Sequence, residues 1–215
     1  MLEKVPKAIL FDWDNTLVDS QQSVSAAINH TLKQMGNNSL QASRHSYVSR
    51  KEFLVNLFGD RWQEAGAIYQ QYLDQQSPFK DLNPNPGVVE MLKNLKQYNL
   101  YLAIVSNKEG NNLRKEVAYL GLSHYFKKII GSGDTSEDKP SPLPAVFALE
   151  GSNIKSSNEV LFVGDSITDV HCAINANCLP IVYGKPMLGY EDLLSFENFN
   201  QFMLLVMPIL EGNNE

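Results

Sequence analysis

The chain has 215 residues, of which 43% are apolar and 20% are charged, a composition ordinary for a globular protein with a sizeable core. Its net charge of −6 and its lack of any Lys/Arg-rich run argue against nucleic acid or an acidic membrane as a partner. Two cysteines are too few for a disulfide scaffold, and the N-terminus lacks a secretory pattern, so we expect a cytoplasmic protein with reduced thiols.

The first predicted element is a buried strand, Ala8-Ile9-Leu10. Asp12 and Asp14 come just after it, and Thr16 follows. In a parallel α/β sheet, ligands bind where the strands end at their carboxyl side. Two carboxylates at that place suggest a nucleophile, a proton carrier and a metal site together.

The next block, from about residue 20 to 80, has helical spacing. Apolar residues recur every three to four positions in 24–32, 53–57 and 62–73, without strand-like alternation. Proline and glycine residues mark the end of the block at 84–87. We therefore predict a small all-helical domain, residues 19–83, inserted after the first strand into a domain formed by 1–18 and 84–215.

The rest of the chain alternates between the two kinds of element. Helical patterns precede apolar strands, which we predict at 100–105, 128–130, 160–163 and 180–182. This alternation predicts an α/β fold with a doubly wound, Rossmann-like parallel sheet. The apolar run 202–207 is too short for a membrane span and predicts a terminal helix, which could pack internally or against a second subunit. The sequence leaves the oligomeric state open.

More polar side chains follow the predicted strands, and we expect them on the same rim of the sheet as the first motif. They are Ser106, Asn107, Lys139, Asp165 and Asp169. Together the motifs supply carboxylates, a hydroxyl, an amide and an ammonium group. That inventory suits a phosphoryl group held beside a divalent cation.

The roles follow from charge, because a phosphate dianion repels a carboxylate nucleophile until its charge is offset. Asp12 and Asp165 offer hard oxygen ligands for Mg²⁺, and Lys139 adds a positive charge for the phosphate oxygens. Asp12 is then the candidate to attack phosphorus and form an aspartyl-phosphate. Asp14 is the candidate to protonate the leaving oxygen and then to deprotonate the hydrolytic water.

These four motifs, in this order, resemble those of the haloacid dehalogenase-like (HAD) superfamily of phosphohydrolases. The place of the helical insertion and the runs at 81–87 and 173–177 are similar to the phosphoglycolate phosphatase subgroup. The resemblance implies that Asp12 is the nucleophile and that Asp14 is the acid/base. It also implies metal ligation by Asp12, by Asp165 and by the backbone carbonyl of Asp14, with Asp169 in support. The substrate-binding set that it implies is Thr16, Ser106, Asn107 and Lys139.

One position departs from the family pattern, since Asn15 stands where glycine is usual. Asparagine tolerates the left-handed backbone conformation better than most residues, so we expect the turn to form.

The sequence thus predicts a Mg²⁺-dependent phosphatase of small phosphorylated metabolites, with the helical domain closing over the site as a cap. Phosphoglycolate is the best single substrate, by resemblance. Two alternatives stay open. A phosphosugar mutase similar to β-phosphoglucomutase would return the phosphoryl group to a sugar, and a non-catalytic binding protein could use the same fold.

Overall fold

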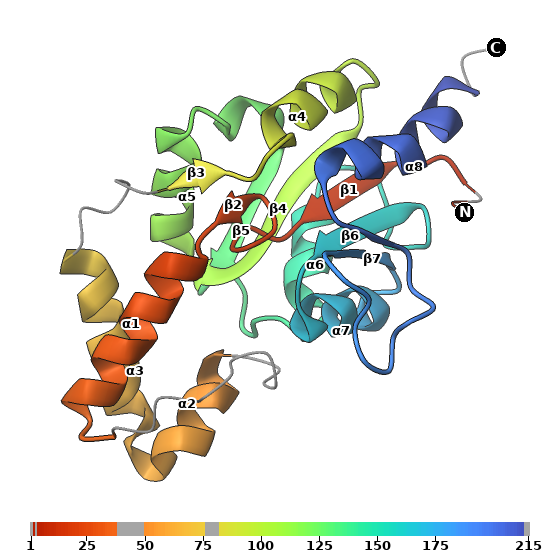
Figure 1. Cartoon of the computed structure of the whole chain (residues 1–215). Helices are drawn as coiled ribbons and strands as arrows, with labels where there is room; N and C mark the ends of the chain where they lie inside the picture. The colour runs from red at the N-terminus through yellow and green to blue at the C-terminus, as the bar shows by residue number, and fades with distance from the viewer. Residues whose placement is uncertain (1, 3, 38–49, 76–81, 213–215) are drawn as a thin grey trace. The chain divides into compact units, whose positions relative to one another are not determined.

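The computed structural model describes residues 2, 4–37, 50–75 and 82–212 (Figure 1). The chain divides into two compact units. One consists of Met1–Val18 with Asn83–Glu215, and the other of Asp19–Leu82. Within the described ranges, no helix combines the length and the apolarity needed to cross a membrane.

The first unit is built on a six-stranded sheet in the order β5-β4-β1-β6-β7-β8. Every neighbouring pair in it is parallel. The strands are β1 (Ala8–Phe11), β4 (Tyr101–Glu109), β5 (Lys128–Ser132), β6 (Val160–Gly164), β7 (Leu179–Tyr183) and β8 (Ser195–Phe196). This confirms the predicted α/β fold with a parallel sheet.

The strand order reverses at β1. From β1 the chain builds β4 and β5 on one side and then returns to build β6, β7 and β8 on the other. Phe11 pairs with Ile104 of β4 and with Val163 of β6, so the residue after β1 lies between the ends of both neighbours. Such a reversal point is where doubly wound sheets bind ligands.

Helices cover both faces of this sheet (Figure 1). They are α4 (Val88–Lys96), α5 (Gly110–Tyr119), α6 (Leu143–Leu149), α7 (Ile167–Asn175) and α8 (Phe199–Glu211), with a short 3₁₀ turn, η3 (Ser123–Tyr125). Leu10 belongs to an apolar cluster with residues of α6 and α7, whereas the ring of Phe11 lies 6.1 Å from that of Phe202 in α8. Successive residues of β1 thus face opposite layers, as the pleat requires. Burial on both faces explains why the strands are continuous apolar runs.

The sheet differs from the prediction in two places. β4 runs on through Ser106 and Asn107 to Glu109, with a shift of register against β5 between Val105 and Glu109. β8 was not predicted, because two residues are too few to show a periodic pattern.

The second unit contains α1 (Gln21–Gln34), α2 (Arg50–Phe58), the 3₁₀ turn η2 (Gly59–Arg61) and α3 (Trp62–Gln75). Its buried apolar cluster is formed by Met35, Phe53, Leu54 and Ala65. The chain joins the two units through a two-stranded sheet in which β2 (Val18–Asp19) pairs with β3 (Asn83–Pro84).

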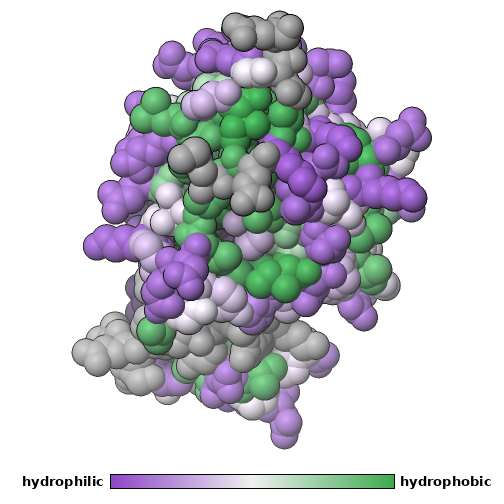
Figure 2. All heavy atoms as spheres, turned by 90° about the vertical axis from the view of Figure 1, so that its right-hand side faces the viewer, coloured by the Kyte–Doolittle hydropathy of each residue, from purple (hydrophilic) through white to green (hydrophobic). Residues whose placement is uncertain are grey.

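The predicted terminal helix is α8, and one of its faces packs internally. Phe199, Phe202, Val206 and Leu210 are buried at helical spacing. Leu204, on another side of the helix, is 75% exposed. Apolar surface gathers in the upper part of Figure 2, which views the molecule from the side where α8 lies in Figure 1.

Candidate active site

The loop after β1 is held by backbone hydrogen bonds. The N–H of Asp12 donates to the carbonyl of Val163 at 2.8 Å, which extends the β1–β6 pairing by one residue. The carbonyl of Trp13 accepts from the N–H groups of Thr16, Leu17 and Val18 at 3.0–3.3 Å. Asn15 has φ 60°, so the left-handed turn expected at this position does form.

Lys139 lies at the centre of the candidate site. Its ammonium Nζ donates to Asp12 Oδ1 at 2.6 Å, to Asp169 Oδ1 at 2.6 Å and to the carbonyl of Val105 at 2.9 Å. Burial disfavours the charged form of a lysine that is 4% exposed, but the attraction of Asp12 and Asp169 outweighs it and raises the pKa of Lys139. The side chain is therefore a fixed positive charge among carboxylates.

The side chain of Asn107 holds the backbone of Lys139. Its Nδ2 donates to the carbonyl of Lys139 at 2.8 Å, and its Oδ1 accepts from the N–H of Lys139 at 2.9 Å. The side-chain amide of Asn107 thus binds both polar groups of the lysine backbone, and the expected contact of Asn107 with substrate stays a prediction. The neighbouring Ser106 is 4% exposed, and its hydroxyl accepts from the N–H of Lys108 at 3.2 Å.

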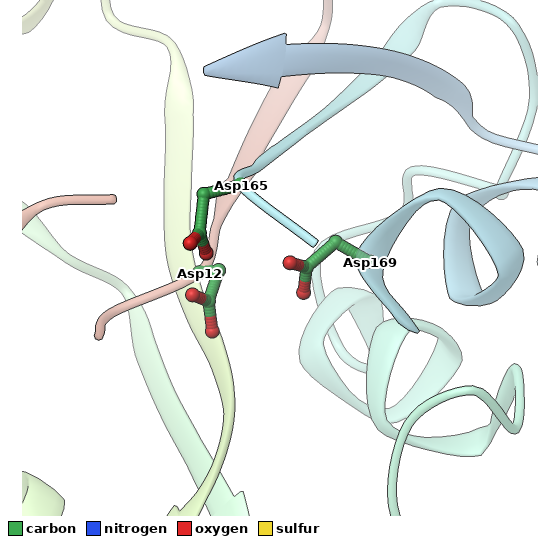
Figure 3. Close-up of side chains that lie close together, drawn as sticks. All are labelled: Asp12, Asp165 and Asp169. Atoms are coloured by element: carbon green, nitrogen blue, oxygen red, sulfur yellow. The ribbon is translucent and has the colours of Figure 1, made fainter. Parts of the chain in front are cut away.

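Three carboxylates meet beside Lys139. Asp12, Asp165 and Asp169 each offer an oxygen, and these oxygens lie within 4.8 Å of one another. Figure 3 shows the three side chains converging from the loop after β1, the end of β6 and the start of α7. The hydroxyl of Thr16 donates towards Asp12 Oδ2 at 3.3 Å and Asp165 Oδ1 at 3.4 Å, which braces two of them.

Asp169 has a double role because its second oxygen caps a helix. Asp169 Oδ2 accepts from the N–H of Ser166 at 3.0 Å, and the hydroxyl of Ser166 accepts from the N–H of Asp169, which completes a capping box on α7. Gly164, at the end of β6, makes the approach possible. A Cβ at this glycine would lie 2.4 Å from Cβ of Asp169, so no larger residue fits without displacing the helix start.

Negative charge gathers in this cluster of carboxylates. Burial raises the pKa of Asp12 to about 7 against the opposing attraction of Lys139, and the charges of Asp169 and Asp14 raise it further. The ammonium group of Lys139 binds Asp12 and Asp169, with Asp165 beside them, and a divalent cation would offset negative charge in such a cluster.

The donor set also fits Mg²⁺ in size. Each ligand oxygen of this ion lies at about 2.0–2.1 Å, so two of them are at most about 4.2 Å apart. Carboxylate oxygens that are within 4.8 Å of one another reach that spacing by small rotations. Both oxygens of Asp169 already accept hydrogen bonds, from Lys139 and from Ser166. Asp12 likewise accepts at both oxygens, from Lys139 and from Thr16, so the direct ligation by Asp12 and Asp165 that the sequence suggests stays a prediction.

The side chain of Asp14 turns to a second network. Lys108 Nζ donates to Asp14 Oδ1 at 2.8 Å and to Glu116 Oε2 at 2.6 Å, and the indole of Trp13 donates to Glu116 Oε2 at 2.7 Å. Burial opposes the charge of Lys108, yet Asp14 and Glu116 together raise its pKa. Burial raises the pKa of Glu116, with Lys108 acting in the opposite direction.

Lys108 and Glu116 were not predicted from the sequence. One signal could have found Glu116, because it stands beside Leu113 and Val117 on the buried side of a predicted helix. A carboxylate in that position needs a partner. Lys108 carries no such signal, since a lysine after a strand is ordinary surface.

The chain is similar to a known family and to known proteins over most of its length. The family model of haloacid dehalogenase-like hydrolases matches residues 9–182, a stretch that includes every residue of both networks. A phosphoglycolate phosphatase of Neisseria gonorrhoeae is 35% identical over 200 residues, which cover 87% of this chain and 82% of that protein. A phosphoglycolate phosphatase of Aquifex aeolicus is 31% identical over 178 residues, covering 79% of this chain and 81% of that one.

A solved structure agrees with these similarities. The crystal structure of a HAD-superfamily hydrolase from Ehrlichia chaffeensis has 40% sequence identity and a TM-score of 0.71. The match covers 96% of this chain and 98% of that one.

Proposed function

Because the chain belongs to the haloacid dehalogenase-like hydrolase family, we propose that it is a Mg²⁺-dependent phosphatase of small phosphomonoesters. The observation that carries the proposal is the position of Lys139, which joins Asp12 and Asp169 beside Asp165 at the reversal point of the sheet. A buried ammonium among hard oxygen ligands suits a phosphoryl group with its counter-ion. The unit Asp19–Leu82 is, in the same proposal, the cap domain of the enzyme.

In this proposal Asp12 and Asp165 hold the metal ion, together with the backbone carbonyl of Asp14. When bound, Mg²⁺ supplies positive charge that reduces the repulsion between the phosphate and its nucleophile. Lys139 contributes a second positive charge and keeps Asp12 oriented through the 2.6 Å contact. Ser106 and backbone N–H groups of the rim donate to the phosphate oxygens.

Asp12 is the nucleophile. One of its carboxylate oxygens attacks phosphorus, a new P–O bond forms, and the bond from phosphorus to the ester oxygen breaks. Asp14 gives its proton to the departing oxygen, so an alcohol leaves and a phosphoryl group remains on Asp12. Asp14 then takes a proton from water, which attacks phosphorus, releases inorganic phosphate and restores Asp12.

The substrate class follows from the relatives. Proteins named phosphoglycolate phosphatase match this chain over most of both lengths, so we propose phosphoglycolate or a similarly small phosphate ester as the substrate. The expected partner is therefore a small metabolite.

Phosphate release from a panel of esters tests the proposal. The panel contains 2-phosphoglycolate, sugar phosphates and nucleotides, each with Mg²⁺ and with a chelator. We expect release that needs Mg²⁺, that is highest for small esters and that disappears in Asp12→Asn. Asp192→Asn, which changes an exposed aspartate outside the carboxylate cluster, is the matched control and should keep full activity. Full activity of Asp12→Asn, or no release of phosphate from any ester, would overturn the proposal.

A further inference from the structure

We propose that Lys108 is a positioning residue that holds the carboxylate of Asp14 in its working orientation, and that Glu116 and Trp13 in turn hold Lys108. This inference rests on the proposed function, in which Asp14 is the proton carrier. Lys108 itself does not touch the substrate in this scheme and acts through the carboxylate of Asp14.

The contacts form a closed ring. Asp14 accepts from Lys108, Lys108 also donates to Glu116, and Glu116 accepts from the indole of Trp13 at the three distances of 2.8, 2.6 and 2.7 Å. Trp13 and Asp14 are neighbours in the chain, so the peptide bond between them closes the ring. A ring of this kind fixes each member twice, whereas a single ion pair would leave the long lysine side chain free to rotate.

The ring is also sheltered. The side chains of Lys108, Asp14 and Glu116 are 17%, 23% and 14% exposed, and Trp13 is fully buried. Ion pairs at such sites are screened less by solvent and salt than pairs on an open surface. Asp14 keeps the most exposure of the three carboxylate and ammonium groups, as a group that must meet substrate requires.

Three different elements build the ring. Asp14 lies in the loop after β1, Lys108 at the end of strand β4 just before α5, and Glu116 on the inner side of α5. The N–H of Lys108 donates to the hydroxyl of Ser106, which in the proposed function binds the phosphate. The network therefore ties the position of the proton carrier to the strand and the helix that border the site, so a displaced α5 would release Asp14.

The test compares two substrates in Lys108→Met. An alkyl phosphate has a poor leaving group, so its cleavage depends on the proton from Asp14. p-Nitrophenyl phosphate has a good leaving group, so its cleavage does not need that proton. We expect kcat/KM for the alkyl ester to fall by about 10- to 100-fold, part of the roughly 10²–10⁴-fold that general acid catalysis contributes. We expect kcat/KM for the aryl ester to change by less than about threefold. Lys108→Arg should restore most of the loss, because it keeps a donor to both carboxylates.

A double-mutant cycle separates positioning from general damage to the fold. If Lys108 acts through Asp14, then Lys108→Met should cause no further loss of alkyl ester hydrolysis in an Asp14→Asn background. Glu116→Gln should show the pattern of Lys108→Met in weaker form. Lys7→Met, which breaks the exposed Lys7–Glu159 pair at the other end of β1, is the control and should leave kcat/KM unchanged for both esters.

An equal loss on both esters, or an additive loss in the cycle, would overturn the inference and leave the phosphatase function standing. A rise of KM confined to substrates that carry a carboxylate would also overturn it, because Lys108 would then be a substrate ligand. Failure of the unmodified protein to hydrolyse either ester would overturn the proposed function itself, and with it the role of Asp14.

Discussion

Lys139 is almost fully buried and yet charged, and its partners explain how both can hold. Its Nζ meets three acceptors, and two of them are carboxylates at 2.6 Å. Removing one member of such a group leaves an uncompensated buried charge, which costs about 3–5 kcal/mol. The residue therefore stabilises the fold and serves the proposed chemistry at once.

Asp134 provides a pH-dependent test at the same scale. Its carboxylate accepts from Arg114 at 2.7 Å and from the N–H of Gly131 at 2.8 Å. Burial acts to raise the pKa of Asp134, but these bonds outweigh it and lower the pKa below 3.8. A carboxylate whose pKa is lower in the folded state stabilises the fold at any pH above its pKa in the unfolded state. That contribution is lost as the pH falls through its pKa in the folded state.

We therefore expect Asp134→Asn to lower the free energy of unfolding by about 1 kcal/mol at neutral pH. The difference in the free energy of unfolding between this variant and the unmodified protein should shrink below pH 4. Urea unfolding at several pH values measures this difference. Glu159→Gln, at an exposed pair, is the control and should leave the midpoint unchanged. A gap of the same size at all pH values would contradict this account.

At the scale of elements, the start of α7 links helix stability to the site. Asp169 caps the helix with one oxygen and holds Lys139 with the other. The start of α8 is a matched case without this link, since Asn198 accepts from the N–H of Gln201 at 3.1 Å and lies outside the carboxylate cluster.

We expect Ser166→Ala and Asn198→Ala to lower stability by similar amounts, about 1 kcal/mol each, because each removes a side-chain cap. Only Ser166→Ala should also reduce kcat, since the carboxylate of Asp169 loses the hydrogen bond that the Ser166 hydroxyl donates to its Oδ2 and keeps only the one from the Ser166 N–H. Thermal unfolding and phosphate release, measured on both variants, test the difference. Equal effects of the two variants on kcat would contradict the link between the cap and the site.

At the scale of the whole molecule, the apolar runs predicted the sheet well because buried parallel strands carry the plainest pattern in a sequence. The candidate site residues could be predicted because they follow these apolar runs, at the carboxyl ends of the strands. The structure brings Asp12, Asp165, Asp169 and Lys139 together. Their roles, and the role of Asp19–Leu82 as a cap, stay predictions. The link from Lys108 to Asp14 could not be foreseen, because it joins residues 94 positions apart and Lys108 lies where the register of β4 against β5 shifts.

Metal binding should be visible in the stability of the first unit. A ligand that binds only the folded state stabilises it by about 2.7 kcal/mol at 100 times its Kd. The chain has two tryptophans, Trp13 in the first unit and Trp62 in the second. In a Trp62→Phe background, Trp13 fluorescence should therefore report the unfolding of the first unit alone.

We expect Mg²⁺ to raise the midpoint of that transition and Asp165→Asn to remove the rise, while Asp192→Asn keeps it. A midpoint that is the same with Mg²⁺ and with a chelator would contradict the assignment of the carboxylate cluster as a metal site.

The central claim is that Asp12 carries the phosphoryl group during turnover, and trapping that group tests it most directly. Asp14→Asn lacks the base for the second step, and p-nitrophenyl phosphate needs no acid for the first, so the phosphorylated protein should accumulate. Mass spectrometry of the acid-quenched protein should then find one added phosphoryl group on the peptide that contains Asp12, and none when Asp12→Asn is added. A phosphoryl group on another residue, or none during continued release of p-nitrophenol, would contradict the claim.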